Sequence, residues 1–257
     1  IYRCMDKVML GILRNETQVG YYTQAENLEW TCLSVITALG TVMVPTASKL
    51  TNQGDQKQLS YYTGLSFQSL TVLTVAISFG LMGMAPAFIP FFLGKEFIPV
   101  VGLIMLLSPS MFFIAWENII RTQYLIPRKR DKAFTLSVFS GALINLIANL
   151  LLIPSLGAYG TVIGTLLAEC SVFIIQSFMA RHVIPVWKNL RSCLYYFIPG
   201  LIMFSAVLFI GTLPLPIVPK LLLQFISGVT VFTAFSLPYM ILKKTILWSA
   251  VCRVFQR

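Results

Sequence analysis

The stretch that decides the fold runs from Glu117 to Glu169 and reads ENIIRTQYLIPRKRDKAFTLSVFSGALINLIANLLLIPSLGAYGTVIGTLLAE. Two apolar segments flank the turn Pro-Ser-Leu-Gly-Ala-Tyr-Gly, and a carboxylate lies at each outer end. A helix needs about 20 apolar residues to cross the roughly 30 Å hydrocarbon core of a bilayer. Ionisable groups at membrane depth cost about 2.5–3.5 kcal/mol each on insertion scales, so they usually mark a pathway. The stretch therefore predicts a helical membrane protein with functional polar groups inside it.

The composition of the whole chain agrees with this prediction. Of its 257 residues, 57% are hydrophobic and 11% are charged, and the mean hydropathy is +0.80. Soluble domains average about 25% charged residues. The net charge of +10 would suit a nucleic-acid-binding protein, but the basic residues occur in short clusters between apolar runs. That pattern is typical of membrane topology signals.

Apolar runs of spanning length recur along the chain. We predict complete spans near residues 28–48, 65–85, 98–119, 134–153, 159–180, 195–213 and 221–242. An incomplete span ends near Leu13, so we expect a fragment or the downstream part of a longer polypeptide. Pro86 and Pro90 either end the second complete span or kink it. The predicted fold class is all-α, a polytopic transmembrane helix bundle with one partial and seven complete spans.

The basic residues predict the orientation of the spans. Those at one set of alternating span ends are Lys49, Lys57, Arg121, Arg128, Lys129, Arg130, Lys132, Arg181, Lys188, Arg191, Lys243, Lys244, Arg253 and Arg257. The opposite set has only Arg14, Lys95 and Lys220. Because basic residues are retained on the cytoplasmic side, we expect a cytoplasmic C-terminus and an external turn at residues 154–157.

The sequence carries no recognisable catalytic motif. G-x-S-x-G, a Walker loop and H-E-x-x-H are all absent, so we do not expect an enzyme. The five cysteines lack C-x-x-C spacing, and we interpret them as small buried hydrophobic residues without a metal role. They are Cys4, Cys32, Cys170, Cys193 and Cys252.

Several polar residues fall inside the predicted spans. Glu117 and Arg121 are four residues apart and can neutralise each other on one helix face, either as a structural pair or as part of a site. Asn145 and Asn149 also share a face, where they either join helices or contact substrate. Glu169 has no charged neighbour within one turn, and we favour a proton or cation site there over an inert protonated acid.

Four further residues and one motif complete the set of intramembrane candidates. Asp6 and Lys7 lie in the partial first span, and Asn118 and Gln123 lie close to Glu117. Gly160 and Gly164 form a G-x-x-x-G motif, which favours close helix packing.

Segments along the first two thirds of the chain, together and in order, carry a resemblance to a known family. They are Asp6 to Gly11, Val19 to Tyr22, Ala25, Thr41 to Pro45, Ser48, Gln123 to Pro127, Ser137, Val138, Gly141, Asn145, Asn149, Leu152 to Pro154, Gly157 to Gly160 and Thr165 to Glu169. Over roughly residues 5–180 the chain resembles the polysaccharide-biosynthesis flippases of the multidrug, oligosaccharidyl-lipid and polysaccharide exporter superfamily.

This resemblance implies a fold and a domain organisation. Family members have two six-helix bundles around a central lumen, often with two extra C-terminal helices. The chain is similar to the second half, with residues 1–182 as the second bundle, its first helix truncated, and residues 183–257 as two additional helices with a cytoplasmic tail. The first bundle of the same protein is then an expected partner.

The resemblance also implies a function. The family moves undecaprenyl-diphosphate-linked oligosaccharide repeat units to the outer leaflet of the bacterial cytoplasmic membrane by alternating access, for capsule, exopolysaccharide or O-antigen synthesis. A polysaccharide polymerase is a further expected partner, and no cofactor is expected apart from a coupling H⁺ or Na⁺. The expected substrate-binding residues are Lys7, Asn118, Arg121, Gln123, Asn145 and Asn149, with Arg3 as a further cation for the diphosphate. The expected ion-coupling residues are Asp6, Glu117 and Glu169.

Two other functions remain open. A cation-coupled multidrug antiporter of the same superfamily would need an acidic lumen, and Arg121 and Lys7 weigh against it. A seven-helix receptor shares the number and direction of the complete spans, but the family segments and the partial first span favour a transporter.

Overall fold

The computed structural model describes residues 2–243 and 245–255, and over these ranges the chain is helical without a strand. The helices are α1 Tyr2–Leu13, α2 Glu16–Val42, α3 Val44–Asn52, α4 Gln56–Phe92, α5 Pro99–Leu107, α6 Ser110–Ile120, α7 Asp131–Leu156, α8 Ala158–Ala180, α9 Val186–Cys193, α10 Phe197–Gly211, α11 Ile217–Leu242 and α12 Ile246–Phe255. Short turns of 3-10 helix (η1 Lys95–Phe97 and η3 Leu194–Tyr196) and of π-helix (η2 Arg121–Leu125) join some of them. The predicted all-α class is confirmed.

Seven helical segments are long and apolar enough to cross a membrane. They are Glu16–Asn52, Gln56–Phe92, Pro99–Leu125, Asp131–Leu156, Ala158–Ala180, Val186–Gly211 and Ile217–Leu242. Each overlaps one predicted complete span, and α1 occupies the place of the partial one. This chain is therefore a multi-pass membrane protein.

The first two spanning segments are longer than the sequence indicated. Each has 37 residues, about 55 Å at 1.5 Å per residue. Asn15 and Asp55 cap their N-termini by accepting hydrogen bonds from the backbone N–H groups of Gln18 and Gln58. The predicted ending of the second span before Pro86 is wrong, because α4 continues to Phe92.

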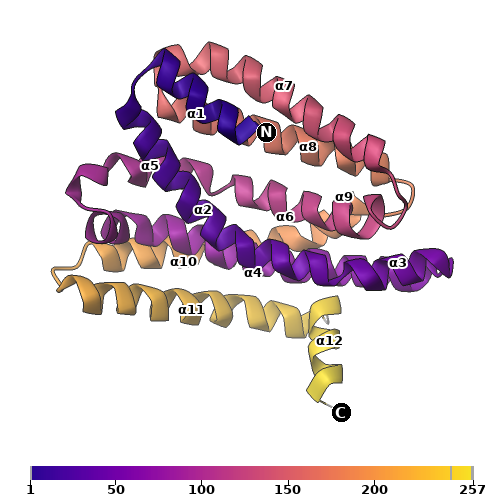
Figure 1. Ribbon diagram of the computed structural model, residues 1–257. Helices are drawn as coiled ribbons and strands as arrows, with labels where there is room; N and C mark the ends of the chain where they lie inside the picture. Colours follow the sequence, from indigo (N-terminus) through magenta and orange to yellow (C-terminus); the bar gives the residue numbers. More distant parts are fainter. Residues whose placement is uncertain (1, 244, 256–257) are drawn as a thin grey trace.

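The helices alternate in direction as the basic residues predicted. In Figure 1 the turns that follow α3, η2 and α8 lie together at the right-hand end, with α12, and the turns after α7 and α10 lie at the opposite end. Two residues of the predicted cytoplasmic set, Lys244 and Arg257, lie outside the described residues.

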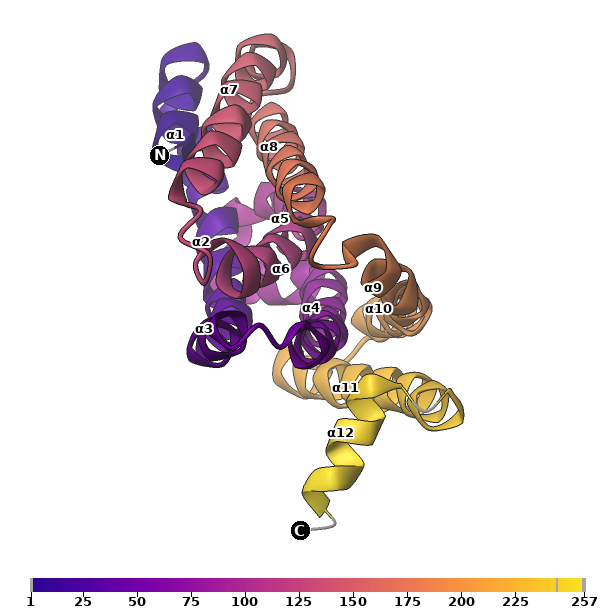
Figure 2. The same ribbon diagram turned by 90° about the vertical axis from the view of Figure 1, so that its right-hand side faces the viewer.

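The bundle has two unequal parts around α4 (Figures 1 and 2). Helices α1, α7 and α8 lie side by side on one side, and α2, α5 and α6 lie between them and α4. Helices α10 and α11 pack against α4 from the other side, and α12 crosses the end of α11. The two clusters of interior polar residues described below both come from the first part.

The contact between α7 and α8 confirms the packing interpretation of Gly160 and Gly164. A Cβ atom on Gly160 would lie 2.6 Å from the backbone of Leu152, and one on Gly164 would lie 2.4 Å from Oδ1 of Asn149. The turn between the two helices depends on Gly157, whose φ of 57° is in the left-handed region. These glycines allow α8 to approach α7 closely enough to cover the asparagine.

The interpretation of the cysteines as buried hydrophobic residues holds for Cys193 alone. Cys4 is exposed, and Cys32, Cys170 and Cys252 are partly buried. All five are free thiols.

Candidate functional site

The interior of the bundle holds five of the nine acidic residues of the chain. They are Asp6 on α1, Glu26 and Glu29 on α2, Glu117 on α6 and Glu169 on α8. Asp6, Glu26, Glu29 and Glu169 are buried. Since charged groups in this environment are costly unless paired, their partners define the site.

The guanidinium of Arg3 lies close to three of these acids. We call the group formed by Arg3, Lys7, Glu26, Glu29 and Glu169 the arginine cluster. Arg3 Nη1 lies 3.5 Å from Glu26 Oε1 and 3.7 Å from Glu29 Oε2, and its Nη2 lies 3.7 Å from Glu169 Oε1. Lys7 Nζ lies 2.7 Å from Glu26 Oε2. The side chains of Arg3 and Lys7 are 16% and 35% exposed, respectively, so the two cations form the accessible side of the cluster.

Two neighbouring side chains hold the arginine cluster in position. The Ser110 hydroxyl on α6 donates a short hydrogen bond to Glu29 Oε1. The guanidinium of Arg3 lies over the ring of Trp30, 4.3 Å from its centroid, a favourable cation–π geometry. The cluster thus connects four helices, α1, α2, α6 and α8.

A second group of polar residues surrounds Asp6, and we call Asp6, Tyr22, Asn145, Asn149 and Thr165 the aspartate cluster. Asp6 Oδ1 accepts a hydrogen bond from Asn149 Nδ2 at 2.6 Å. Its Oδ2 accepts from the hydroxyls of Tyr22 at 2.9 Å and Thr165 at 3.2 Å. No basic side chain lies within 4 Å of this carboxylate among the described residues. Asp6 is therefore held entirely by neutral donors.

The aspartate cluster also contains hydrogen-bonding capacity that the described residues leave unused. Asn149 Nδ2 donates to Asn145 Oδ1 at 3.1 Å, but Asn145 Nδ2 and Asn149 Oδ1 are buried without a hydrogen-bond partner. Buried polar groups are nearly always satisfied in native proteins.

Helical periodicity explains how each helix supplies its part of the two clusters. Residues three, four or seven positions apart lie on one face of a helix. Arg3, Asp6 and Lys7 share such a face on α1, Tyr22, Glu26 and Glu29 share one on α2, and Thr165 and Glu169 share one on α8. The two clusters are therefore adjacent layers of one polar interior.

The predicted pairing of Glu117 with Arg121 is electrostatic and is not a direct contact. The two side chains form no ion pair within 4 Å, and Arg121 instead donates from Nη2 to Asn118 Oδ1 at 2.8 Å. Arg121 begins the π-helical turn η2, which changes the direction of side chains relative to a regular helix. Glu117 Oε2 is buried and has no hydrogen-bond partner among the described residues.

Two of the expected substrate-binding residues lie between helices. Gln123 is fully buried, and its Nε2 donates to Ser66 Oγ on α4 at 2.6 Å. Asn118 Nδ2 donates to the Thr37 carbonyl on α2 at 3.3 Å and fills the space beside Gly40. This geometry favours a role in helix packing for both residues.

The sequence interpretation missed Glu26 and Glu29, and it did not place Tyr22 or Thr165 in a site. The predicted span began at residue 28, which assigned Glu26 to a connection. The spacing of Tyr22, Glu26 and Glu29 on one face was the available signal, since it continues the helix two turns earlier. The structure also supplies Glu169 with a cation, Arg3, from a distant part of the sequence.

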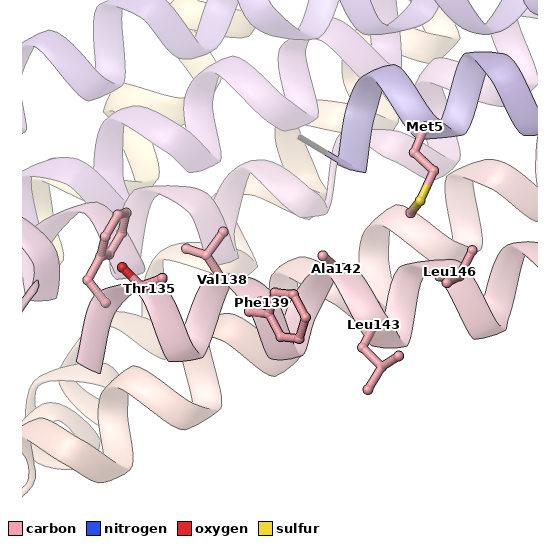
Figure 3. A pocket seen from close by; sticks show the side chains of 8 residues that line it. Met5, Thr135, Val138, Phe139, Ala142, Leu143 and Leu146 are labelled. Atoms are coloured by element: carbon pink, nitrogen blue, oxygen red, sulfur yellow. The ribbon is translucent and has the colours of Figure 1, made fainter. Parts of the chain in front are cut away.

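An apolar groove lies along α7, next to the first turns of α1 (Figure 3). It has a volume of about 480 Å³, and Met5 on α1 lies at one end of it. The other lining residues are Phe134, Thr135, Val138, Phe139, Ala142, Leu143 and Leu146. Within the described part of the chain nothing covers this face.

Comparisons with known proteins agree with the resemblance. Residues 1–102 match a family model described as polysaccharide biosynthesis protein. A curated relative from Haloferax volcanii, named "Probable low-salt glycan biosynthesis flippase Agl15", is 23% identical over 95% of this chain and 52% of its own length. Another, from Shigella dysenteriae and named "Putative O-antigen transporter", is 25% identical over 71% of this chain and 44% of its own length.

A solved structure shares the fold. The chain titled "Lipid II flippase MurJ, inward closed conformation" matches with a TM-score of 0.79 at 17% identity, over 93% of this chain and 50% of that one. The present chain spans about half the length of the relatives that it matches. The chain is thus similar to polysaccharide-biosynthesis proteins over residues 1–102 and shares its fold with the MurJ chain.

Proposed function

We propose that the protein flips undecaprenyl-diphosphate-linked oligosaccharide repeat units from the inner to the outer leaflet of a bacterial cytoplasmic membrane by alternating access. The arginine cluster carries this proposal. Arg3 and Lys7 are two cations on the accessible side of this cluster. A diphosphate needs such partners, because a guanidinium offers a planar fork and an ammonium offers a point charge. The protein transports its substrate and changes no covalent bond.

We further propose that transport is coupled to a cation through the aspartate cluster. Asp6 has only neutral donors around it, and the adjacent amides have unused capacity. A buried carboxylate in this setting gains from a bound Na⁺ or H⁺, because either one removes an uncompensated charge. Oxygen atoms of carboxylates, amides and hydroxyls are the ligands that hard cations prefer.

The rest of the molecule fits a two-bundle transporter. We propose that residues 1–182 form the second bundle, that residues 183–257 add two helices and a cytoplasmic tail, and that the first bundle of the same polypeptide completes the lumen. The proposal is supported by the match to the MurJ chain, of which the present chain covers 50%. A polysaccharide polymerase would receive the product on the outer side.

A multidrug antiporter is the second candidate, and one observation favours it. The interior holds Glu26 and Glu29 as well as the three acids expected from the sequence, so it is more acidic than expected. Against it, Arg3 and Lys7 occupy the accessible side of the arginine cluster. The shared fold with the MurJ chain weighs against the receptor hypothesis.

A complementation experiment separates the two candidates. The gene product as encoded would be expressed in a bacterium that lacks its O-antigen flippase, and lipopolysaccharide would be analysed on gels. We expect restored O-antigen and unchanged resistance to cationic drugs. Raised drug resistance without restored O-antigen would instead support the antiporter.

A further inference from the structure

The turn between α1 and α2 is fastened to the turn between α7 and α8. Arg14 donates from Nε to the Ile153 carbonyl at 3.1 Å and from Nη2 to the Pro154 carbonyl. Gln18 Oε1 accepts a hydrogen bond from the backbone N–H of Ala158 at 2.8 Å. We call Arg14 and Gln18 the latch. It joins two helix pairs at the end of the bundle that faces outside in the predicted orientation.

The latch uses backbone groups that helix ends leave free. The carbonyls in the last turn of a helix and the N–H groups in its first turn have no partner within the helix. Pro154 lies in the last turn of α7, and Ala158 begins α8. A Cβ atom on Gly157, whose φ is 57°, would collide with Oε1 of Gln18. The two turns are therefore complementary in shape as well as in hydrogen bonding.

A layer of apolar side chains separates the latch from the aspartate cluster. Leu10 on α1, Ile153 on α7 and Val162 on α8 are fully buried and belong to one apolar cluster. Each lies three or four positions nearer to the outer end of its helix than a member of the aspartate cluster, which is about 5–6 Å. We call these three residues the plug. An ion that came from the outer end would have to cross this layer without hydrogen-bonding partners, which is costly.

The aspartate cluster has a more accessible neighbour on another side. Asp6 itself is fully buried. Lys7, the next residue on α1, has a side chain that is 35% exposed. The aspartate cluster therefore has a closed outer end and an accessible neighbour on the side of Lys7.

We propose that the latch and the plug form an external seal of the aspartate cluster, so that the coupling cation reaches Asp6 only from the side of Lys7. The inference rests on the proposed coupling of transport to a cation and adds the route by which the cation enters and leaves. A coupling site must never be open to both sides of the membrane at once, because the cation would then cross without moving substrate. Loss of the seal should turn the aspartate cluster into a leak.

The test measures passage of the cation without substrate. The intact gene product would be reconstituted in proteoliposomes, and uptake of radioactive Na⁺ and of protons would be followed in the absence of any lipid-linked sugar. In Arg14→Ala combined with Gln18→Ala we expect uptake of one of the two cations to rise about 10- to 100-fold, the shift that corresponds to losing a hydrogen bond to a charged group. Lys95→Ala changes an exposed basic residue in η1, also of the predicted outer set, and should match the wild type.

A further variant separates leakage through the site from damage to the bundle. Addition of Asp6→Asn to the double variant removes the carboxylate, so uptake should return to the wild-type level. Leakage through a damaged bundle would persist. Should the double variant fail to fold, Arg14→Ala alone takes its place, because Arg14 is exposed and its loss leaves no buried cavity.

Two outcomes would overturn the inference. One is a folded latch variant whose cation uptake equals that of the wild type, and the other is a raised uptake that persists after Asp6→Asn. Both leave the proposed coupling intact if flipping by the wild type responds to an imposed cation gradient. A wild type whose flipping responds to neither a Na⁺ nor a pH gradient refutes the coupling itself, and the seal with it.

Discussion

Asp6 on α1 and Asn149 on α7 are 143 positions apart in the sequence, and their side chains meet at 2.6 Å inside the bundle. The contact joins helix α1 to helix α7. It also places a carboxylate beside the unsatisfied Oδ1 of the same asparagine. This pair is the centre of the proposed coupling site.

Replacement of Asp6 by Asn should uncouple transport from the cation. The substitution keeps the shape of the side chain and removes its charge, so the fold should persist. In proteoliposomes with an imposed Na⁺ or pH gradient, we expect the wild type to respond to one of the two and Asp6→Asn to respond to neither. The partly exposed acid Asp55, which lies outside both clusters, provides the control as Asp55→Asn. An unchanged gradient response in Asp6→Asn would rule out the aspartate cluster as the coupling site.

Gly160→Ala should destabilise the bundle. The new Cβ would lie 2.6 Å from the backbone of Leu152, which cannot move without separating α7 from α8. Overpacking of this kind costs about 1–3 kcal/mol. Thermal unfolding followed by circular dichroism should show a lower Tm.

Gly20→Ala is the matched control for this change. Gly20 lies within α2, and its added Cβ would meet nothing within 4 Å. Alanine is favoured over glycine in a helix by about 1 kcal/mol, so the Tm should stay the same or rise. Equal losses of Tm in both variants would contradict the packing account.

Gln123→Leu should affect stability and spare transport. It removes the hydrogen bond to Ser66 and leaves that hydroxyl unpaired, at a cost of about 1–3 kcal/mol. Flipping normalised to folded protein should remain within about twofold of the wild type, an allowance that reflects the modest effect expected of a packing residue. A large loss of flipping at unchanged stability would show that Gln123 contacts substrate, as the sequence analysis expected.

The orientation of the chain can be tested by cysteine labelling. In a variant without native cysteines, a cysteine at Ser155 should react with an impermeant maleimide added outside intact cells. A cysteine at Lys129 should react only after the membrane is permeabilised. The opposite pattern would invert the topology and place the C-terminus outside.

The sequence alone predicted the fold class and the number of spans, because long apolar helices are encoded by local composition. The ends of the helices were harder to predict from the sequence. Residues 16–27 and 86–92 have polar residues or prolines that lowered the expectation of a helix, yet capping by Asn15 and packing inside the bundle extend α2 and α4 through them.

The residues of the candidate site could be only partly predicted from the sequence. Asp6, Lys7, Asn145, Asn149 and Glu169 were recognised as intramembrane polar residues, and the structure brings all five into two adjacent clusters. Their partners were not predictable from spacing, because they lie on other helices. Glu169 and Arg3 are 166 positions apart, and only the packing of α1 and α8 against α2 brings them together.

The most direct test of the central claim is a flipping assay on the intact gene product. Proteoliposomes would contain a fluorescent isoprenyl-diphosphate sugar, and an impermeant reductant would bleach the molecules that reach the outer leaflet. We expect the wild type to expose the inner-leaflet pool and Arg3→Gln to slow this at least about tenfold, which corresponds to 1.4 kcal/mol. Lys188→Gln, on α9 away from the arginine cluster, should match the wild type. Equal rates for Arg3→Gln and the wild type would contradict the assignment of Arg3 to the diphosphate.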